Sequence, residues 1–257
     1  MYKTEEKIVE QLILLKNTNC LAGIKAEFEA EGSSIEDLHR LRRITSHVGI
    51  DLFLKIGGPE AKRDIINSLE VGVDGIIAPM IESKFAAKKF IDAYQSIYMD
   101  KDIHTSINIE TKQGVRDFKE IAKFISGSIN NITFGRSDLS SSYFSDLAPE
   151  SKEVYLKMEE VSEIAIQNNM TFTFGGGVTK KTLSNILDYH ILQKNTLKIE
   201  TRKVVFNFKE VAKKPELINE ALKFEELYIL SKKEFIGLLI NSEIGRLTEL
   251  EKRIKNE

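Results

Sequence analysis

The sequence predicts an α/β protein, a (β/α)8 barrel of the TIM type with a helical extension at its C-terminal end. Short, almost continuously apolar runs alternate with stretches whose apolar residues have helical spacing, as expected for a parallel sheet covered by helices. The chain has 257 residues, which is about the length that one such barrel needs. After about residue 207 no further strand pattern appears.

The order of elements begins with an amphipathic helix over residues 4–17, and seven strands follow, most of them separated by helices. A helix that follows the first strand should begin at Ser34, since Asp37 completes a capping-box pattern. With seven strands, either the first helix replaces one strand or one strand is missed, and a seven-stranded open or partly closed barrel is an alternative. The predicted strands are residues 20–28, 51–56, 75–79, 105–109, 131–134, 171–174 and 196–199, the last extending towards 206.

The apolar pattern divides the chain into a barrel domain, residues 1–207, and a C-terminal helical extension, residues 208–257. In the extension Leu222, Phe224, Leu227 and Leu230 cluster closely, and leaving such side chains in water is costly. We therefore expect the extension to join subunits of a homo-oligomer. The alternative is that it caps the barrel of its own subunit.

Composition excludes several classes of function. The net charge of −2 gives no case for nucleic acid or an anionic membrane as the main partner. No run approaches the roughly 20 apolar residues of a membrane span, and the charged N-terminus does not resemble a signal peptide. The single cysteine, Cys20, excludes an intrachain disulfide framework. These features predict a cytoplasmic protein.

Two consecutive predicted strands each deliver a carboxylate at their C-terminal end. Glu110 follows the strand 105–109, and Asp138 closes the segment Gly135-Arg136-Ser137-Asp138 after the strand 131–134. In a parallel barrel these ends share one face, where active sites lie. Two acids there can bind a hard divalent cation and leave positions for water and substrate. Alternatively, Glu110 caps a helix and Asp138 N-caps the next one.

Several motifs together resemble one family, the metal-dependent 2-keto-3-deoxy acid aldolases of the HpcH/HpaI type, grouped with the citrate lyase β-subunit. The similarity spans roughly residues 23–206. It rests on residues 72–82 (GVDGIIAPMIE), 108–111 (NIET) and 134–140 (FGRSDLS). The departures described below would make this chain a divergent member.

The resemblance implies roles for the residues that match these motifs. Glu110 and Asp138 would be ligands of Mg²⁺ or Mn²⁺. The backbone amides of residues 136–138 would receive the carboxylate of pyruvate, which makes Gly135, Arg136 and Ser137 candidate substrate-binding residues. Amides at a helix N-terminus suit an anion. The resemblance also implies a trimer or hexamer in which C-terminal segments cross to a neighbour.

Two departures from the family pattern concern catalysis. Lys55 stands where the family's aldolases have an arginine, and a lysine is a point charge that cannot form a bidentate clamp. The turn Lys25-Ala26-Glu27-Phe28 stands where the family has its catalytic histidine. Lys55 is therefore expected to carry the charge facing the substrate, Lys25 to bind substrate, and Glu27, or else Glu29 or Glu31, to replace the histidine.

The leading hypothesis is a metal-dependent carbon-carbon lyase that cleaves or forms a bond between a pyruvate or phosphoenolpyruvate unit and an aldehyde. A first alternative is a Schiff-base aldolase that uses Lys25 or Lys55. A second is a non-catalytic family member that retains a ligand pocket. The run Gly175-Gly176-Gly177 ends a strand on the same face and either lets a ligand approach the backbone or simply forms a tight turn.

Overall fold

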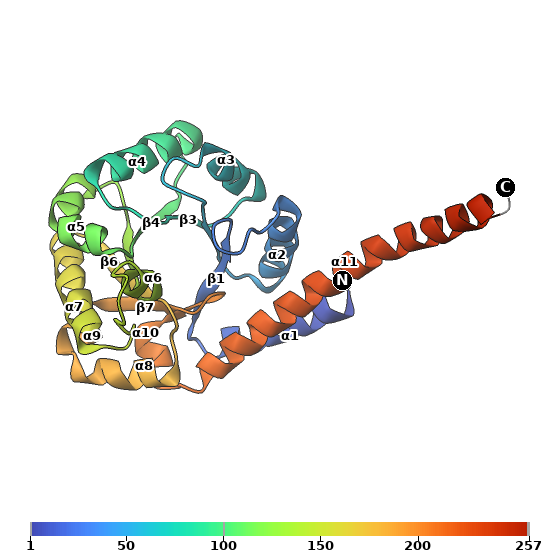
Figure 1. The fold of residues 1–257 in the computed structure, drawn as a ribbon. Helices are drawn as coiled ribbons and strands as arrows, with labels where there is room; N and C mark the ends of the chain where they lie inside the picture. Colours follow the sequence, from blue (N-terminus) through green and yellow to red (C-terminus); the bar gives the residue numbers. More distant parts are fainter. Residues whose placement is uncertain (1, 100, 256–257) are drawn as a thin grey trace.

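The computed structural model describes residues 2–99 and 101–255, and within them eight strands close a barrel in chain order (Figure 1). Strands β1 to β7 are parallel, whereas β8 runs antiparallel to both of its neighbours, β7 and β1. The strands are β1 (Leu21–Glu27), β2 (Leu52–Lys55), β3 (Gly75–Ala78), β4 (His104–Ile109), β5 (Asn131–Gly135), β6 (Thr171–Gly175), β7 (Thr196–Glu200) and β8 (Val204–Asn207).

The predicted fold class is confirmed, and the strand missing from the sequence pattern lies in residues 196–206. This stretch is a hairpin of β7 and β8 rather than one long strand. Its turn has no glycine, proline or asparagine to mark it in the sequence. Instead the Thr201 hydroxyl accepts a hydrogen bond from the Val204 amide, at 3.1 Å, and the Thr201 amide donates to the Val204 carbonyl, at 2.9 Å. A threonine side chain thus closes the turn.

Helices surround the barrel and are joined to it by short loops (Figure 1). The Ser34–Asp37 capping box is present, with the Asp37 amide donating to Ser34 Oγ at 3.2 Å. The helices are α1 (Lys3–Asn17), α2 (Ile35–Val48), α3 (Lys62–Val71), α4 (Lys84–Tyr98), α5 (Lys112–Ile125), α6 (Arg136–Ser141), α7 (Lys152–Gln167), α8 (Lys180–Asn185), α9 (His190–Asn195), α10 (Phe208–Val211) and α11 (Leu217–Lys255), with a 3-10 turn η1 (Ile186–Asp188).

The strands alternate between an apolar outer face and a polar inner face, because successive side chains of a strand point to opposite sides. On β5, Ile132 and Phe134 are fully buried in the core cluster that includes residues of the surrounding helices. Asn131, which precedes Ile132 and points to the inner face, donates to Ser106 Oγ at 2.8 Å and accepts from Thr173 Oγ1 at 3.0 Å. The barrel interior is therefore a hydrogen-bonded polar layer.

A small apolar cluster lies below this polar layer and gives the barrel a floor. Phe53, Ile77 and Val205 form it. The Phe53 ring fits because two neighbouring strands carry glycine: a Cβ at Gly23 would lie 2.4 Å from the ring, and one at Gly75 would lie 2.7 Å from it. This floor separates the polar groups near the C-terminal ends of the strands from the N-terminal end of the barrel.

Helix α11 has 39 residues and lies beside α1 before continuing alone, away from the barrel (Figure 1). Of its clustered apolar residues, Phe224 is buried against its own chain and Leu227 is partly buried, whereas Leu222 and Leu230 are exposed. The first half of α11 therefore belongs to the coat of the barrel. Among the described helices, none combines the length and the apolarity that crossing a membrane requires.

Candidate functional site

A cavity of about 230 Å³ opens at the C-terminal ends of the parallel strands. The side chains and loops around it come from β1, β2, β4, β5, β6 and β7, so the barrel gathers residues that are far apart in sequence. The lining includes the predicted site residues Lys25, Glu27, Lys55, Glu110, Gly135, Ser137 and Asp138, together with Glu29, Asn108, Glu200, Arg202 and residues 175–177.

Lys25 is buried between two carboxylates. Its Nζ lies 3.0 Å from Oε1 of Glu27 and 3.3 Å from Oε1 of Glu200. Burial alone would lower the pKa of Lys25, but Glu200 and Glu27 outweigh it and raise that pKa well above its ordinary value. Lys25 is therefore a fixed positive charge at neutral pH.

Lys55 links the first loop of the barrel to the end of β4. Its Nζ lies 2.6 Å from Oε2 of Glu29 and 3.7 Å from Oε2 of Glu110. Burial opposes ionisation, but the carboxylates of Glu110, Glu29 and Glu27 together raise the pKa of Lys55. In return, Lys25 and Lys55 overcome the effect of burial on Glu27 and lower the pKa of that carboxyl.

Glu110 is directed into the cavity and does not cap a helix. Its Oε1 accepts from the Met80 amide and its Oε2 from Asn108 Nδ2, both at 3.0 Å. Thr111 is the residue that N-caps α5. Burial raises the pKa of Glu110, with Lys55 opposing this effect. Only glycine fits beside it, since a Cβ at Gly135 would lie 2.5 Å from Oε2.

Asp138 lies in the first turn of α6, whose N-cap is Gly135, so Asp138 is not the capping residue. It is exposed at the cavity, and within the described residues its carboxylate has no hydrogen bond or ion pair. Its negative charge contributes to the raised pKa of Glu110. Asn108 Oδ1, buried beside Glu110, also lacks a hydrogen-bond partner in the described structure.

Carboxylate oxygens are ligands that Mg²⁺ and Mn²⁺ prefer, so the side chains of Glu110 and Asp138 fit a hard divalent cation. The described residues contain no cluster of three or more His, Cys, Asp or Glu arranged to hold a metal. The pair of acids would therefore share the cation with water or substrate oxygens.

The loop after β6 leaves bare backbone next to the start of α6. Gly176 has φ +85°, and a Cβ there would lie 2.6 Å from the Ser137 amide nitrogen and 2.9 Å from that of Arg136. A side chain at Gly176 would fill the space in front of these amides. Glycine is required both for the positive φ and for the close approach.

The Arg136 side chain lies outside the cavity and secures the surrounding loops. It is fully buried and donates to the carbonyl oxygens of Gly175, at 3.1 Å, and Gly176, at 2.7 Å. Its Nη1 also donates to Glu150 Oε1 at 2.7 Å. Burial alone would raise the pKa of Glu150. Hydrogen bonds from Thr182 and Tyr155 and the charge of Arg136 outweigh burial and lower that pKa to about 2. Only the backbone of Arg136 can face a ligand.

The β7–β8 turn closes the remaining side of the cavity. Lys203 is buried, is paired with Glu31, and lies 4.3 Å from the centre of the Tyr228 ring on α11. Arg202, the central residue of the turn, is exposed and lines the cavity. Of the three acids considered as replacements for the missing histidine, Glu31 is thus tied to the turn, whereas Glu27 and Glu29 line the cavity.

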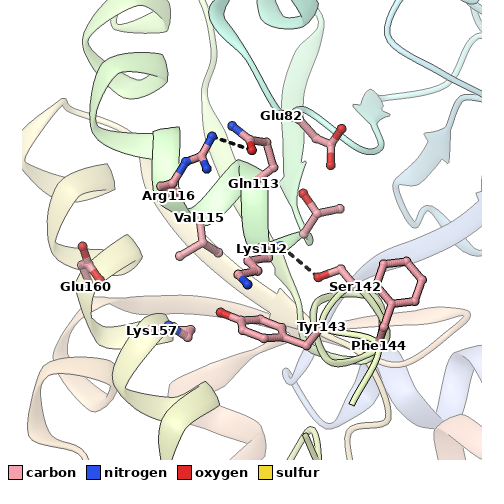
Figure 2. A pocket seen from close by; sticks show the side chains of 11 residues that line it. Glu82, Lys112, Gln113, Val115, Arg116, Ser142, Tyr143, Phe144, Lys157 and Glu160 are labelled. Carbon is pink, nitrogen blue, oxygen red and sulfur yellow. Dashed lines mark hydrogen bonds between the residues drawn. The ribbon is translucent and has the colours of Figure 1, made fainter.

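A second, wider groove of about 790 Å³ lies beside α5 and α7, outside the barrel (Figure 2). The ammonium groups of Lys112 and Lys157 lie 5.2 Å and 5.8 Å from the centre of the Tyr143 ring. Ser142 accepts from the Lys112 amide at 2.9 Å, and Phe144 is 97% exposed. None of the predicted site residues lines this groove. The cavity at the strand ends is therefore the better candidate for a site.

Asn108, Glu200 and Arg202 also line the cavity, although no role was predicted for them from the sequence. A signal for the first two was available, because Asn108 stands two residues before Glu110 and Glu200 two residues after Lys198, the spacing of one face of a strand. Arg202 carried no such signal, since its position depends on the unrecognised turn.

Comparison with known proteins places this site in context. The family model for HpcH/HpaI aldolase/citrate lyase matches residues 55–175, from the last residue of β2 to the last residue of β6. No curated protein matches the chain significantly.

Solved structures share the barrel. One is an HpcH/HpaI aldolase from Desulfitobacterium hafniense DCB-2, with TM-score 0.63 and 15% identity over 78% of this chain and 82% of that one. Another is an HpcH/HpaI aldolase/citrate lyase family protein from Burkholderia cenocepacia J2315, with TM-score 0.62 and 12% identity over 85% and 89%. The citrate synthase SbnG has TM-score 0.58 and 18% identity over 73% and 88%. At these identities they show a common fold. Together with the family match over residues 55–175, they confirm the resemblance of this chain to the HpcH/HpaI aldolase/citrate lyase family.

Proposed function

We propose that the protein is a metal-dependent carbon-carbon lyase that acts on a 2-keto acid. The observation that carries this proposal is the pair Glu110 and Asp138 at the ends of two adjacent strands, facing one cavity beside two protonated lysines. A divalent cation, Mg²⁺ or Mn²⁺, held by these acids would polarise the keto and carboxylate oxygens of the substrate.

Lys55 is proposed to stabilise negative charge that develops on the substrate. Its raised pKa keeps it protonated, and its partners Glu29 and Glu110 fix its position on the cavity wall. A preoriented charge needs little reorganisation when the reaction occurs. The amides of residues 136–138 and the bare backbone at Gly176 would accommodate the substrate carboxylate, since free amide groups suit an anion. Lys25 would add positive charge below them.

Glu27 is proposed to transfer protons in place of the missing histidine. Its lowered pKa keeps it ionised, so that it can accept a proton, but also makes it a weak base. Phe28 follows it in the chain and packs partly buried against the core. Glu29, paired with Lys55, is the neighbouring carboxylate and the second candidate.

The second substrate is proposed to be an aldehyde, so that the reaction joins it to, or releases it from, a pyruvate or phosphoenolpyruvate unit. The single cysteine, buried and unpaired, supports a reducing compartment and hence the cytoplasm. The division into a barrel, residues 1–207, and an extension, residues 208–257, is part of the proposal.

The test is a condensation assay with pyruvate and a panel of aldehydes, with Mn²⁺, with Mg²⁺ and after chelation. We expect product formation that chelation abolishes and Mn²⁺ restores. Activity that persists unchanged after chelation would overturn the metal-dependent mechanism. Binding of pyruvate without turnover of any aldehyde would favour the non-catalytic alternative, which the absent histidine and arginine motivate.

The Schiff-base alternative is opposed by the state of the two candidate lysines. A lysine nucleophile must be deprotonated, which usually requires a lowered pKa, whereas the pKa values of Lys25 and Lys55 are both raised. Borohydride reduction in the presence of pyruvate should therefore leave the protein mass unchanged. A mass increase that maps to Lys25 or Lys55 would establish the alternative.

A further inference from the structure

The second half of α11 leaves the body of the protein with an apolar surface uncovered. From Ile236 to Lys255 no described side chain is buried, and this part of the helix extends alone beyond α1 (Figure 1). It nevertheless carries large apolar side chains, with Ile240 48% exposed and Ile254 72% exposed. A helix with such side chains requires a covering surface.

Most of the exposed large apolar residues of α11 fall on one line with alternating steps of three and four residues. The line also includes the charged Glu226, Lys233 and Glu243, and it leaves out Leu230, Leu238, Leu239 and Ile244. We call the following set the outer seam: Leu222, Glu226, Ile229, Lys233, Ile236, Ile240, Glu243, Leu247, Leu250 and Ile254. This spacing is the pattern by which two helices pack along a shared line. The seam lies away from α1, since the residues of α11 that are buried in the body are Leu217, Ile218, Ala221, Phe224, Tyr228 and Ser231.

The outer seam is complementary to itself when a second copy is laid antiparallel with the midpoint at residue 238. Ile236 then meets Ile240 of the partner subunit, and Ile229 meets Leu247 of the partner subunit. At the ends of the seam, Leu222 meets Ile254 of the partner subunit. Because the contact is twofold, each pairing occurs twice.

Three charged pairs are favourable in the same register, whereas Lys232 meets Arg246 of the partner subunit and Glu226 meets Leu250 of the partner subunit. Lys233, within the seam, meets Glu243 of the partner subunit. Beside the seam, Lys223 meets Glu251 of the partner subunit, and Glu225 meets Arg253 of the partner subunit. A parallel pairing would instead place Lys233 against its own copy and Glu243 against its own copy, which is unfavourable.

A groove of about 400 Å³ marks where the partner would lie. It is lined by Leu222, Glu225, Glu226, Ile229 and Leu230, on the half of α11 that packs against the body. In the antiparallel register this groove receives Ile244 and Leu247 of the partner subunit, and then Leu250 and Ile254 of the partner subunit. We propose that two copies of this chain associate through an antiparallel pairing of their α11 helices. This contact produces a dimer, or a larger assembly built from dimers, and it does not depend on the proposed activity.

Cysteine cross-linking of the full-length protein tests the direction of the pairing. The variants Ile229→Cys and Leu247→Cys are made separately, and the native Cys20 is buried. In the antiparallel register two copies of either variant hold their cysteines about 27 Å apart. Each variant alone should therefore form little disulfide-linked dimer under mild oxidation, whereas an equal mixture should form it efficiently. Efficient linkage of each variant to itself would establish a parallel pairing and overturn the proposal.

Charge exchange at Lys233 and Glu243 tests the register by light scattering. Lys233→Glu should weaken the dimer by about tenfold or more, since it opposes two carboxylates. The double variant Lys233→Glu/Glu243→Lys should restore it. Both residues are exposed, and circular dichroism should show that each variant is folded.

A wild-type chain that is monomeric at micromolar concentration would refute the pairing, as would a trimer. A monomer that binds anionic lipid vesicles would refute it too, and would assign the apolar face to a membrane surface. A double variant that stays as weak as Lys233→Glu would refute the register.

Discussion

The Lys55 ammonium group lies 3.7 Å from the Glu110 carboxylate and so connects the end of β2 to the end of β4. The strand between them, β3, leads to Met80, whose amide donates to the other Glu110 oxygen. A buried carboxylate is thus stabilised by one charge and by hydrogen bonds, and it lines the same cavity as Asp138. Whether this carboxylate binds a metal, and what Lys55 contributes, can be measured separately.

Glu110→Gln and Asp138→Asn should each weaken Mn²⁺ binding by at least about tenfold, because each removes one negatively charged donor. Titration calorimetry on the two variants and the wild type measures this directly. Glu82→Gln is the matched control, since Glu82 lines the outer groove and not the cavity. Wild-type affinity in both site variants would locate the metal elsewhere or exclude it.

Lys55→Met should abolish turnover, or weaken pyruvate binding by about tenfold or more, because it removes the charge nearest to Glu110. Circular dichroism should show that the variant is folded. Lys89→Met, which breaks an exposed pair with Glu60, should leave both properties unchanged. Full activity of Lys55→Met would show that another group carries the positive charge facing the substrate.

Gly176→Ala should reduce pyruvate affinity, because its Cβ would enter the space in front of the Ser137 amide at 2.6 Å. The control is Gly177→Ala, which has a similarly positive φ but whose Cβ has only the Ser137 hydroxyl near it, at 3.8 Å. Gly177→Ala should lose about 1 kcal/mol of stability from backbone strain, and Gly176→Ala should lose more, because its Cβ would also overlap two backbone nitrogens. Equal affinity in the two variants would mean that the ligand does not use these amides.

Glu150→Gln should destabilise the fold by about 2–3 kcal/mol at neutral pH, because it leaves the buried Arg136 guanidinium without its counter-charge. The pKa of Glu150 is lowered from 4.5 to about 2. The ionised Glu150 therefore makes its full contribution to the free energy of unfolding above pH 4.5, and this contribution is lost as the pH falls towards 2. Urea unfolding at pH 7 and at pH 3 measures both effects.

For the variant, we expect a smaller loss of stability on acidification than for the wild type. Glu153→Gln, at an exposed position on α7, should behave like the wild type. A wild-type stability that does not change between the two pH values would contradict the assignment of this carboxylate.

Much of the barrel could be predicted because its signals are local. The apolar runs at residues 75–79 and 131–134 coincide closely with β3 and β5, since a strand covered on both faces must be short and apolar. The strand-end positions of Lys55 and Glu110 followed from the runs at residues 51–56 and 105–109. Their location in one cavity follows from barrel closure, which brings the ends of parallel strands together.

Other features of the fold and the site could not be predicted, because they depend on contacts between side chains of different elements, which a local sequence pattern does not show. Arg136 was expected among the substrate-binding residues, but its side chain is buried against Glu150, which lies in the loop between α6 and α7. The carboxylates that hold Lys25 and Lys55 come from neighbouring strands and loops. The β7–β8 turn was missed because a threonine hydroxyl closes it instead of a glycine or proline.

The pairing of β8 with β1 has a consequence for synthesis of the chain on the ribosome. β1 is the first strand to be made, yet its second neighbour, β8, is made only after all the other strands. Until then one edge of β1 exposes unpaired backbone groups next to apolar side chains such as Ile24, a state that promotes association with other chains. The barrel can close only after Asn207 has emerged. A nascent chain stalled before that residue should therefore be more sensitive to protease than one released a few tens of residues later.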